Sequence, residues 1–225
     1  LASAPRGDGH PVLVLPGMLA SDRSTGVLRT YLANLGYEVH KWELGRNLGA
    51  RAIGVEGERL IERLSTIHRA NGRKVSLIGW SLGGAFAQLL GRRLPEHVRS
   101  VITLGSPLRG DPRASNVWRI YEMATGDRVD SVRTTRQRDE IAAPPEVPTT
   151  AIFSKADGVV PWWNCQVTEG PTAENVEVYG SHCGLGVNAA ALYVIADRLA
   201  QKPGEWRRFA PMALAAPLYP RARAS

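Results

Sequence analysis

One serine of the sequence has the flanking residues that build a reactive hydroxyl. The stretch Ile78–Phe86 reads IGWSLGGAF and places Ser81 between Gly79 and Gly83, after an apolar run and before a helical pattern. Gly-x-Ser-x-Gly at a strand-to-helix turn exposes the serine hydroxyl above a sheet, because glycines avoid the clashes that larger residues would make there. The hydroxyl still needs a base that accepts its proton. Alone, the motif predicts a nucleophile and an ordinary glycine-rich turn equally well.

The base and the carboxylate that would activate this serine stand later in the chain. Asp157 follows the apolar run TTAIFS, and His182 follows the run NVEVYG. Both positions are carboxyl ends of predicted strands, where open parallel sheets build their sites. Taken singly, Asp157 fits a turn and His182 fits a loop. In the order Ser81, Asp157, His182 they favour a catalytic triad, in which the carboxylate orients the histidine.

No other histidine or acid competes well for these roles. The remaining histidines precede a strand or lie within a strand, a helix or a short turn: His10, His40, His68 and His97. Among the aspartates, Asp197 belongs to the last predicted helix and several others to the segment 106–148. The sequence has no His-x-x-His or Cys-x-x-Cys spacing and no acidic cluster suited to a metal. We therefore expect chemistry without a metal or any other cofactor.

Acyl transfer by a serine also needs N–H donors for the oxyanion of the tetrahedral intermediate. One usual donor is the residue after the nucleophile, which is Leu82 here. The second usually comes from the loop after an early strand, and Met18 follows the stretch LPG at the end of the first predicted strand. Gly17 gives this backbone the freedom to turn toward the site. The alternative is that LPGM is only a Pro-Gly turn.

Apolar residues next to these groups in the sequence are candidates for substrate binding. The predicted pocket residues are Leu19, Val159, Trp162, Trp163 and Leu185. Core packing is the alternative for each of them, and it is the favoured interpretation for Trp80, which lies between the strand and the helix of the serine turn.

Short apolar runs alternate with segments of helical period along the chain. Six runs predict strands: PVLVLPG, YEVHKW, KVSLIGW, VRSVITLG, TTAIFS and NVEVYG. Helices are predicted at 24–35, around 60–72, at 83–94 and at 188–200. This alternation predicts an α/β fold with a mostly parallel sheet of about six strands flanked by helices. We expect a single domain over residues 1–225, with a C-terminal tail at 203–225.

The segment 106–148 interrupts the alternation after the fourth predicted strand. It has no strand signal, many charges and one short amphipathic piece at 117–123. Loops of this length without structure are uncommon unless they are functional. We therefore expect a small cap or lid insertion whose apolar side chains cover the pocket: Trp118, Ile120, Tyr121 and Met123. The alternative is a helix packed on the sheet edge away from the site.

Length and charge limit the class of protein. The 225 residues, 44% of them hydrophobic, suffice for one core. The net charge of +7 comes from scattered arginines without a nucleic-acid-binding motif, so we expect a basic solvated surface and no nucleic-acid partner. No apolar run approaches the roughly 18 residues of a transmembrane helix, so we expect no such segment. The sequence begins at Leu1 without a charged segment followed by an apolar one, which leaves the compartment open.

These motifs together resemble the α/β-hydrolase superfamily, and within it the bacterial lipases and esterases with a single Gly-x oxyanion motif. The resemblance covers about residues 9–201 and rests on VLVLPGM, GWSLGG, ITLGSP, ADGVVP and GSHCGLG. The oxyanion loop differs, because many such enzymes have His-Gly where this chain has Pro16-Gly17. The resemblance implies hydrolysis of carboxylic esters through an acyl-serine intermediate, whereas residue types and spacing alone imply acyl transfer.

The expected activity is therefore that of an esterase or lipase. Its substrate would be a small-molecule or lipid ester, with transient contact to a lipid surface left open. A thioesterase or a lipid acyltransferase would use the same Ser81, Asp157 and His182. A non-catalytic binding protein on this fold is a further alternative, although no triad member is missing.

The two cysteines follow the predicted acid and base. Cys165 lies after Asp157 and Cys183 directly after His182, in loops that leave the same edge of the predicted sheet. Such loops can bring two Cα atoms within the roughly 4.4–6.8 Å that a disulfide requires. We expect a Cys165–Cys183 bridge, which would favour a secreted or periplasmic protein. The alternative is a pair of reduced cysteines, as is usual in cytoplasmic enzymes.

Overall fold

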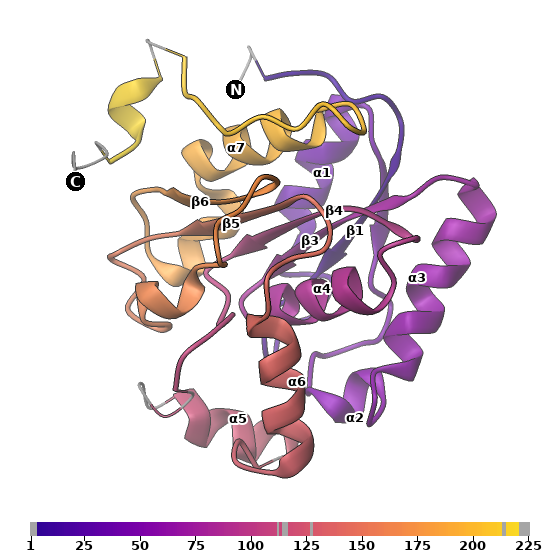
Figure 1. The fold of residues 1–225 in the computed structure, drawn as a ribbon, viewed down its shortest axis with the longest axis vertical. Coiled ribbons are helices and arrows are strands. Elements are labelled where there is room, and N and C mark those ends of the chain that lie inside the picture. Colours follow the sequence, from indigo (N-terminus) through magenta and orange to yellow (C-terminus); the bar gives the residue numbers. More distant parts are fainter. Residues whose placement is uncertain (1–3, 112, 114–116, 127, 213–214, 221–225) are drawn as a thin grey trace.

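The computed structural model describes residues 4–111, 113, 117–126, 128–212 and 215–220. Within these residues a parallel sheet of six strands has the order β2-β1-β3-β4-β5-β6 (Figure 1). The strands are β1 (Pro11–Leu15), β2 (Glu38–Lys41), β3 (Val75–Trp80), β4 (Val98–Leu104), β5 (Thr149–Phe153) and β6 (Ala173–Glu177). Each overlaps a run from which the sequence predicts a strand, so the predicted α/β fold is confirmed.

Helices cover both faces of the sheet (Figure 1). The helices α1 (Gly26–Leu35) and α7 (Ala189–Leu199) pack on one face. The other face is covered by α2 (Ala50–Ile53), α3 (Glu58–Asn71) and α4 (Leu82–Arg93). Because both faces are covered, the central strands are apolar on both sides and do not alternate with polar residues.

The strand β1 shows how the two hydrophobic cores are separated. Val12 and Val14 belong to the core beneath α1 and α7, whereas Leu13 and Leu15 belong to the core beneath α3 and α4. Successive side chains of a strand point to opposite faces, so one continuous apolar run supplies both cores. All four side chains are fully buried, and this anchors the loop after β1 beside the candidate site.

The segment 106–148 connects β4 to β5 and contains two helices, α5 (Val117–Thr125) and α6 (Val132–Ala142). In Figure 1 both lie beyond one end of the sheet, and α6 packs against α4. The sequence predicts α5 but does not predict α6 or the short α2. In α6 only Thr134 and Ile141 are buried, so its apolar stripe is too sparse to be recognised from periodicity. Ser131 caps its start by accepting a hydrogen bond from the Thr134 amide.

The C-terminal segment returns to the body of the fold and is held there by buried polar groups. Arg198 pairs with Glu174 (Nη1–Oε1, 2.7 Å), and the other Glu174 oxygen accepts the amide of Phe209 (2.7 Å). Tyr219 is buried, and its hydroxyl donates to the carbonyl of Ala190. Phe209 and Tyr219 therefore attach the described part of the predicted tail to the body, although most of its other residues are exposed. None of the described helices combines the length and apolar character of a membrane span.

Candidate active site

Ser81 occupies a strained turn between β3 and α4. Its φ is 53° and its ψ is −125°, a conformation that costs energy for any residue except glycine. A Cβ at Gly79 would lie 2.3 Å from the carbonyl oxygen of Gly83, and a Cβ at Gly83 would lie 2.5 Å from that of Leu15. Only glycines fit at these close approaches, so the Gly-x-Ser-x-Gly spacing is what lets α4 begin directly at the sheet edge.

Asp157 and His182 form a buried hydrogen-bonded pair. The Nδ1–H of His182 donates to Asp157 Oδ2 over 2.8 Å, and the two residues are 8% and 4% exposed. The other oxygen, Oδ1, accepts the amides of Val159 (3.0 Å) and Val160 (2.7 Å). Trp80 Nε1 donates to the backbone carbonyl of His182 over 3.1 Å. The carboxylate is thus held from both sides, and it fixes the tautomer in which Nε2 of His182 is an acceptor.

The end of β4 brings this pair close to the serine turn. The Ser81 amide donates to the carbonyl of Leu104 over 2.8 Å. A Cβ at the next residue, Gly105, would lie 2.8 Å from Asp157 Oδ2 and 3.2 Å from His182 Nδ1. The absence of a side chain at Gly105 therefore leaves the space that Asp157 and His182 occupy. Within the described residues the Ser81 hydroxyl has no hydrogen bond to His182 or to any other group.

The two predicted oxyanion donors flank the serine. Met18 and Leu82 line the same cavity as Ser81, and a Cβ at Gly17 would lie 3.3 Å from the Ser81 Cβ. Leu82 is the first residue of α4, and the first amides of a helix have no intrahelical acceptor. No described residue accepts a hydrogen bond from the Met18 amide. Their use as oxyanion donors stays a prediction.

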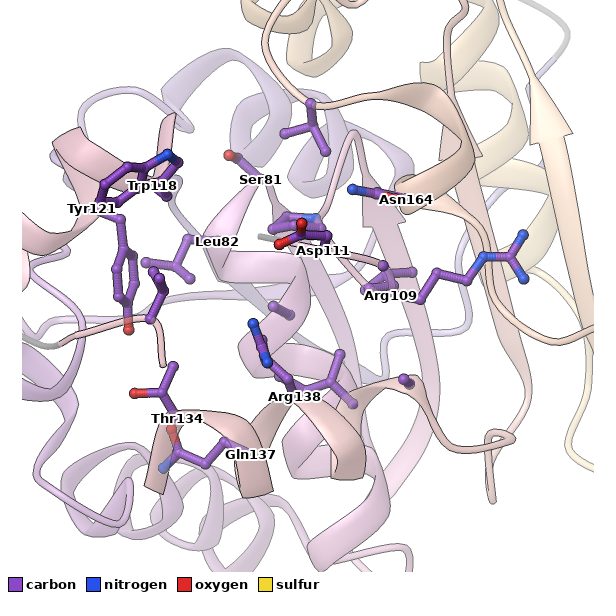
Figure 2. Close-up of a pocket in the computed structure, with 18 of the residues that line it drawn as sticks. Ser81, Leu82, Arg109, Asp111, Trp118, Tyr121, Thr134, Gln137, Arg138 and Asn164 are labelled. Atoms are coloured by element: carbon purple, nitrogen blue, oxygen red, sulfur yellow. The ribbon is translucent and has the colours of Figure 1, made fainter. Parts of the chain in front are cut away.

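A cavity of about 240 Å³ opens beside Ser81, between the start of α4 and the helices α5 and α6 (Figure 2). Trp118 and Tyr121 of α5 line it, whereas Met123 is 79% exposed. The side chain of Ile120 lies outside the described residues. Most of the remaining wall is apolar and comes from Leu82, Ala85, Phe86, Leu108, Val129, Ile141 and Val160.

The cavity is lined by other residues than the five predicted pocket residues. Leu185 is fully buried in the core, Trp162 stacks on Phe153, and Val159 packs beside it. Leu19 and Trp163 are 42% and 52% exposed. In the short helix η2 (Trp162–Cys165) successive side chains point in different directions, so Asn164 lines the cavity while its neighbours do not. In the loop after Asp157, Val160 and Asn164 line the cavity, whereas Val159, Trp162 and Trp163 do not.

The predicted disulfide between Cys165 and Cys183 is wrong, because both residues are free cysteines. Cys165 is fully buried, and its thiol lies 3.7 Å from the carbonyl of Pro161. Burial raises the pKa of Cys165 to about 12. Cys183 is exposed at the start of η3 (His182–Val187). Each loop continues as a 3-10 helix that directs its cysteine differently, one inward and one to solvent, so the argument from a bridge to an extracytoplasmic compartment does not hold.

The fold is shared with known hydrolases, although no family model matches the chain. The mature Bacillus licheniformis lipase BlEst2 is 19% identical with a TM-score of 0.62, covering 88% of this chain and 95% of that one. A monoacylglycerol lipase from Paleococcus ferrophilus is 14% identical with a TM-score of 0.63, covering 88% and 96%. An α/β superfamily hydrolase from Oenococcus oeni is 15% identical with a TM-score of 0.59, covering 87% and 94%. The chain therefore has the α/β-hydrolase fold.

Proposed function

We propose that this protein is a serine hydrolase of carboxylic esters, with Ser81 as nucleophile, His182 as base and Asp157 as the residue that orients the base. The observation that carries the proposal is the buried Asp157–His182 hydrogen bond at the sheet edge where the strained Ser81 turn opens on a cavity. A strained serine, a fixed imidazole tautomer and a cavity beside the serine are three features on which acyl transfer by a triad relies, together with the oxyanion donors.

The first half of the reaction forms an acyl-enzyme. Nε2 of His182 accepts the proton of the Ser81 hydroxyl as the oxygen attacks the ester carbonyl, and the hydrogen bond to Asp157 stabilises the imidazolium. Apo structures often lack the nucleophile–base hydrogen bond, which forms when substrate binds. The amides of Leu82 and Met18 hold the oxyanion. The imidazolium then gives its proton to the leaving alcohol.

The second half returns the enzyme to its starting state. A water molecule loses a proton to Nε2 of His182 and attacks the acyl carbonyl, and the same two amides stabilise the second oxyanion. Collapse of this intermediate returns the proton to Ser81 and releases the acid. An acceptor alcohol in place of water would make the enzyme an acyltransferase, and a thioester in place of the ester would make it a thioesterase.

The segment 106–148 is proposed to act as the cap of this site. Trp118 and Tyr121 line the cavity from α5, with Trp118 beside Ser81 and the Tyr121 hydroxyl directed toward Thr134 (Figure 2). Apolar walls of this kind favour burial of the hydrocarbon part of an acyl chain, since burial contributes about 25 cal/mol per Å² of apolar surface. Truncating Trp118 should therefore change the preferred chain length.

The test is a profile of kcat/KM across p-nitrophenyl esters from acetate to palmitate, with Ser81→Ala as the blank. We expect turnover that a serine-directed phosphonate abolishes. A thioester series run in parallel separates esterase from thioesterase. A folded wild-type protein that hydrolyses none of these substrates would contradict the proposal.

The cap is tested with a matched pair of variants on α5. Trp118→Ala should shift the chain-length optimum, because it enlarges the cavity, whereas Met123→Ala should leave the profile unchanged, because Met123 is exposed. An identical profile for wild type and both variants would remove the cap from the proposal without affecting the triad.

A further inference from the structure

The cavity wall contributed by α6 holds an arginine without a counter-ion. Arg138 is partly buried, and its guanidinium points into the cavity (Figure 2). No carboxylate in the described chain lies within ion-pairing distance of it, and its side chain makes no hydrogen bond to these residues. Its neighbour Arg136 is exposed and pairs with Glu56 over 2.5 Å. A partly buried cation without a counter-ion is available to pair with an anion that binds in the cavity.

A second polar side chain, Asn164, faces the cavity without a protein partner. Asn164 is only 6% exposed, and its side-chain amide, which points into the cavity in Figure 2, has no hydrogen-bond partner in the described structure. Its backbone is fully engaged, because its carbonyl accepts the amides of Leu108 and Arg109. The amide is open to the cavity, so a ligand there could bond to it without displacing a protein partner. Arg138 and Asn164 therefore both favour a ligand that carries polar atoms.

The other charged residues of the wall do not compensate Arg138. Arg109 turns away from the cavity and donates to the carbonyl of Trp163 and to Gln166 Oε1 (Figure 2). Asp111 and Asp139 are exposed, and Asp111 accepts the amide of Arg113 over 2.8 Å. Water screens exposed charges more than partly buried ones. The least solvated charge facing the cavity is therefore positive.

We infer that the cavity selects esters that carry a second, anionic group, a carboxylate or a phosphate, which Arg138 binds while Ser81 attacks the ester carbonyl. The inference rests on the proposed function and specifies its substrate class. A guanidinium matches the geometry of both oxyanions through two parallel N–H donors. The Asn164 amide supplies a further donor for the oxygen atoms of the same group or of the chain that carries it.

The experiment compares matched anionic and neutral substrates. On the acyl side the pair is p-nitrophenyl hydrogen adipate and p-nitrophenyl hexanoate. On the alcohol side the pair is 1-hexanoylglycerol 3-phosphate and 1-hexanoylglycerol, and their hydrolysis is measured by the protons it releases. The readout is the ratio of kcat/KM for the anionic substrate to that for the neutral one, and the pair with the larger ratio identifies which side carries the anion.

We expect Arg138→Gln to lower this ratio by about tenfold for at least one pair, the effect of losing a charge-assisted hydrogen bond. Arg138→Glu should lower it further. Asn164→Asp, which keeps the side-chain size and adds a negative charge to the cavity, should also lower it. Arg136→Gln is the control, because it removes an arginine from the exposed side of the same helix, and its ratio should equal that of the wild type.

Ratios that are equal in the wild type, Arg138→Gln and Asn164→Asp for both pairs would overturn the inference. Hydrolysis of the neutral esters would still support the proposed function in that case. If the wild type hydrolyses neither member of either pair, the proposed function fails and the inference fails with it. Raising the ionic strength should reduce the ratio of the wild type toward that of Arg138→Gln.

Discussion

Two sets of serine, histidine and aspartate lie at opposite ends of β3, and they differ in almost everything except residue type. At the carboxyl end are Ser81 and the pair of His182 with Asp157. At the amino end His10 lies 2.9 Å from the hydroxyl of Ser76 through Nε2, and its Nδ1 lies 2.5 Å from Asp8 Oδ1. The second set has the more complete chain of hydrogen bonds.

The amino-end set is closed to any substrate. His10 and Ser76 are both 0% exposed, and the Ser76 hydroxyl also forms a hydrogen bond with the Ser100 hydroxyl over 3.0 Å. The ring of Tyr37 packs on the edge of His10, with centroids 5.0 Å apart. Ser81, in contrast, sits on a strained backbone beside a cavity. Three residue types joined by hydrogen bonds do not make a nucleophile, because access and backbone geometry decide what the hydroxyl can reach.

The electrostatics of the amino-end set are those of a structural network. Burial lowers the pKa of His10 to about 4, although the hydrogen bond with Asp8 acts in the opposite direction. The charges of Arg99 and Arg73 lower it further. Burial raises the pKa of Asp8, but hydrogen bonds from Arg99 and His10 outweigh this and hold it well below its usual range. His10 is therefore neutral at pH 7, and Asp8 is an anion held by arginines.

The largest effect expected from this comparison is on catalysis. Ser81→Ala and His182→Ala should each lower kcat/KM for p-nitrophenyl butyrate by a factor of about 10⁴ or more, because a triad acts as a unit. Ser76→Ala should retain near-wild-type kcat/KM when folded, because Ser76 lies in the interior. Circular dichroism checks the folding of each variant. Near-normal turnover by Ser81→Ala, or a folded but inactive Ser76→Ala, would break the distinction between the two sets.

Features that depend on local sequence patterns could be predicted, whereas features that depend on contacts between distant residues could not. The central strands follow from continuous apolar runs and the edge strands β2 and β6 from alternating ones. The order of Ser81, Asp157 and His182 follows from the strand ends after which they lie. The helix α6 has too few buried residues for a periodic signal, so Arg138 on the cavity wall had no recognisable motif. The contact between His10 and Ser76 spans 66 residues and depends on the pairing of β1 with β3. The direction of a side chain in a short 3-10 helix depends on tertiary packing. It determines that Cys165 is buried, that Cys183 is exposed and that Asn164 lines the cavity.

The second effect is on stability and concerns the amino-end set. His10→Ala should lower the free energy of unfolding at pH 7 by about 2–4 kcal/mol, since it leaves a space in the interior and removes a partner from buried Ser76. Urea unfolding measures the change. The kcat/KM of the folded variant serves as the internal control and should stay within about twofold of the wild type. A loss of activity without a loss of stability would indicate that His10 serves the active site.

The third effect is the pH dependence of that stability. In the unfolded chain the pKa of His10 is about 6.5, whereas burial lowers it to about 4 in the folded protein. The unfolded state therefore binds more protons between these values, so stability falls as the pH falls from 6.5 to 4. Asp8 adds little above pH 5, because its carboxyl is ionised in both states there. Its lowered folded pKa adds to the loss only as the pH approaches the unfolded pKa of about 3.9.

The expected contribution of His10 to this loss is on the order of 2 kcal/mol. Urea midpoints at pH 7.0, 5.5 and 4.5 measure the loss, and His10→Gln removes the titrating group while keeping a polar side chain. The difference in stability between wild type and His10→Gln should shrink as the pH falls. A difference that stays constant from pH 7.0 to 4.5 would contradict the neutral, buried state of His10.

The smallest effect is the difference in thiol reactivity between the two cysteines, which differ in exposure as the two serine sets do. In the native protein Cys183 should react quickly with a thiol reagent, because it is exposed, and Cys165 should not, because burial raises its pKa to about 12. Denatured, unreduced protein should show both thiols, and native Cys183→Ser should show no fast one. A reductant should move the free energy of unfolding by less than about 0.5 kcal/mol, whereas a disulfide closing a loop of this size would contribute about 3 kcal/mol. Absence of free thiols in the denatured sample would restore the bridge and contradict the separation of Cys165 from Cys183.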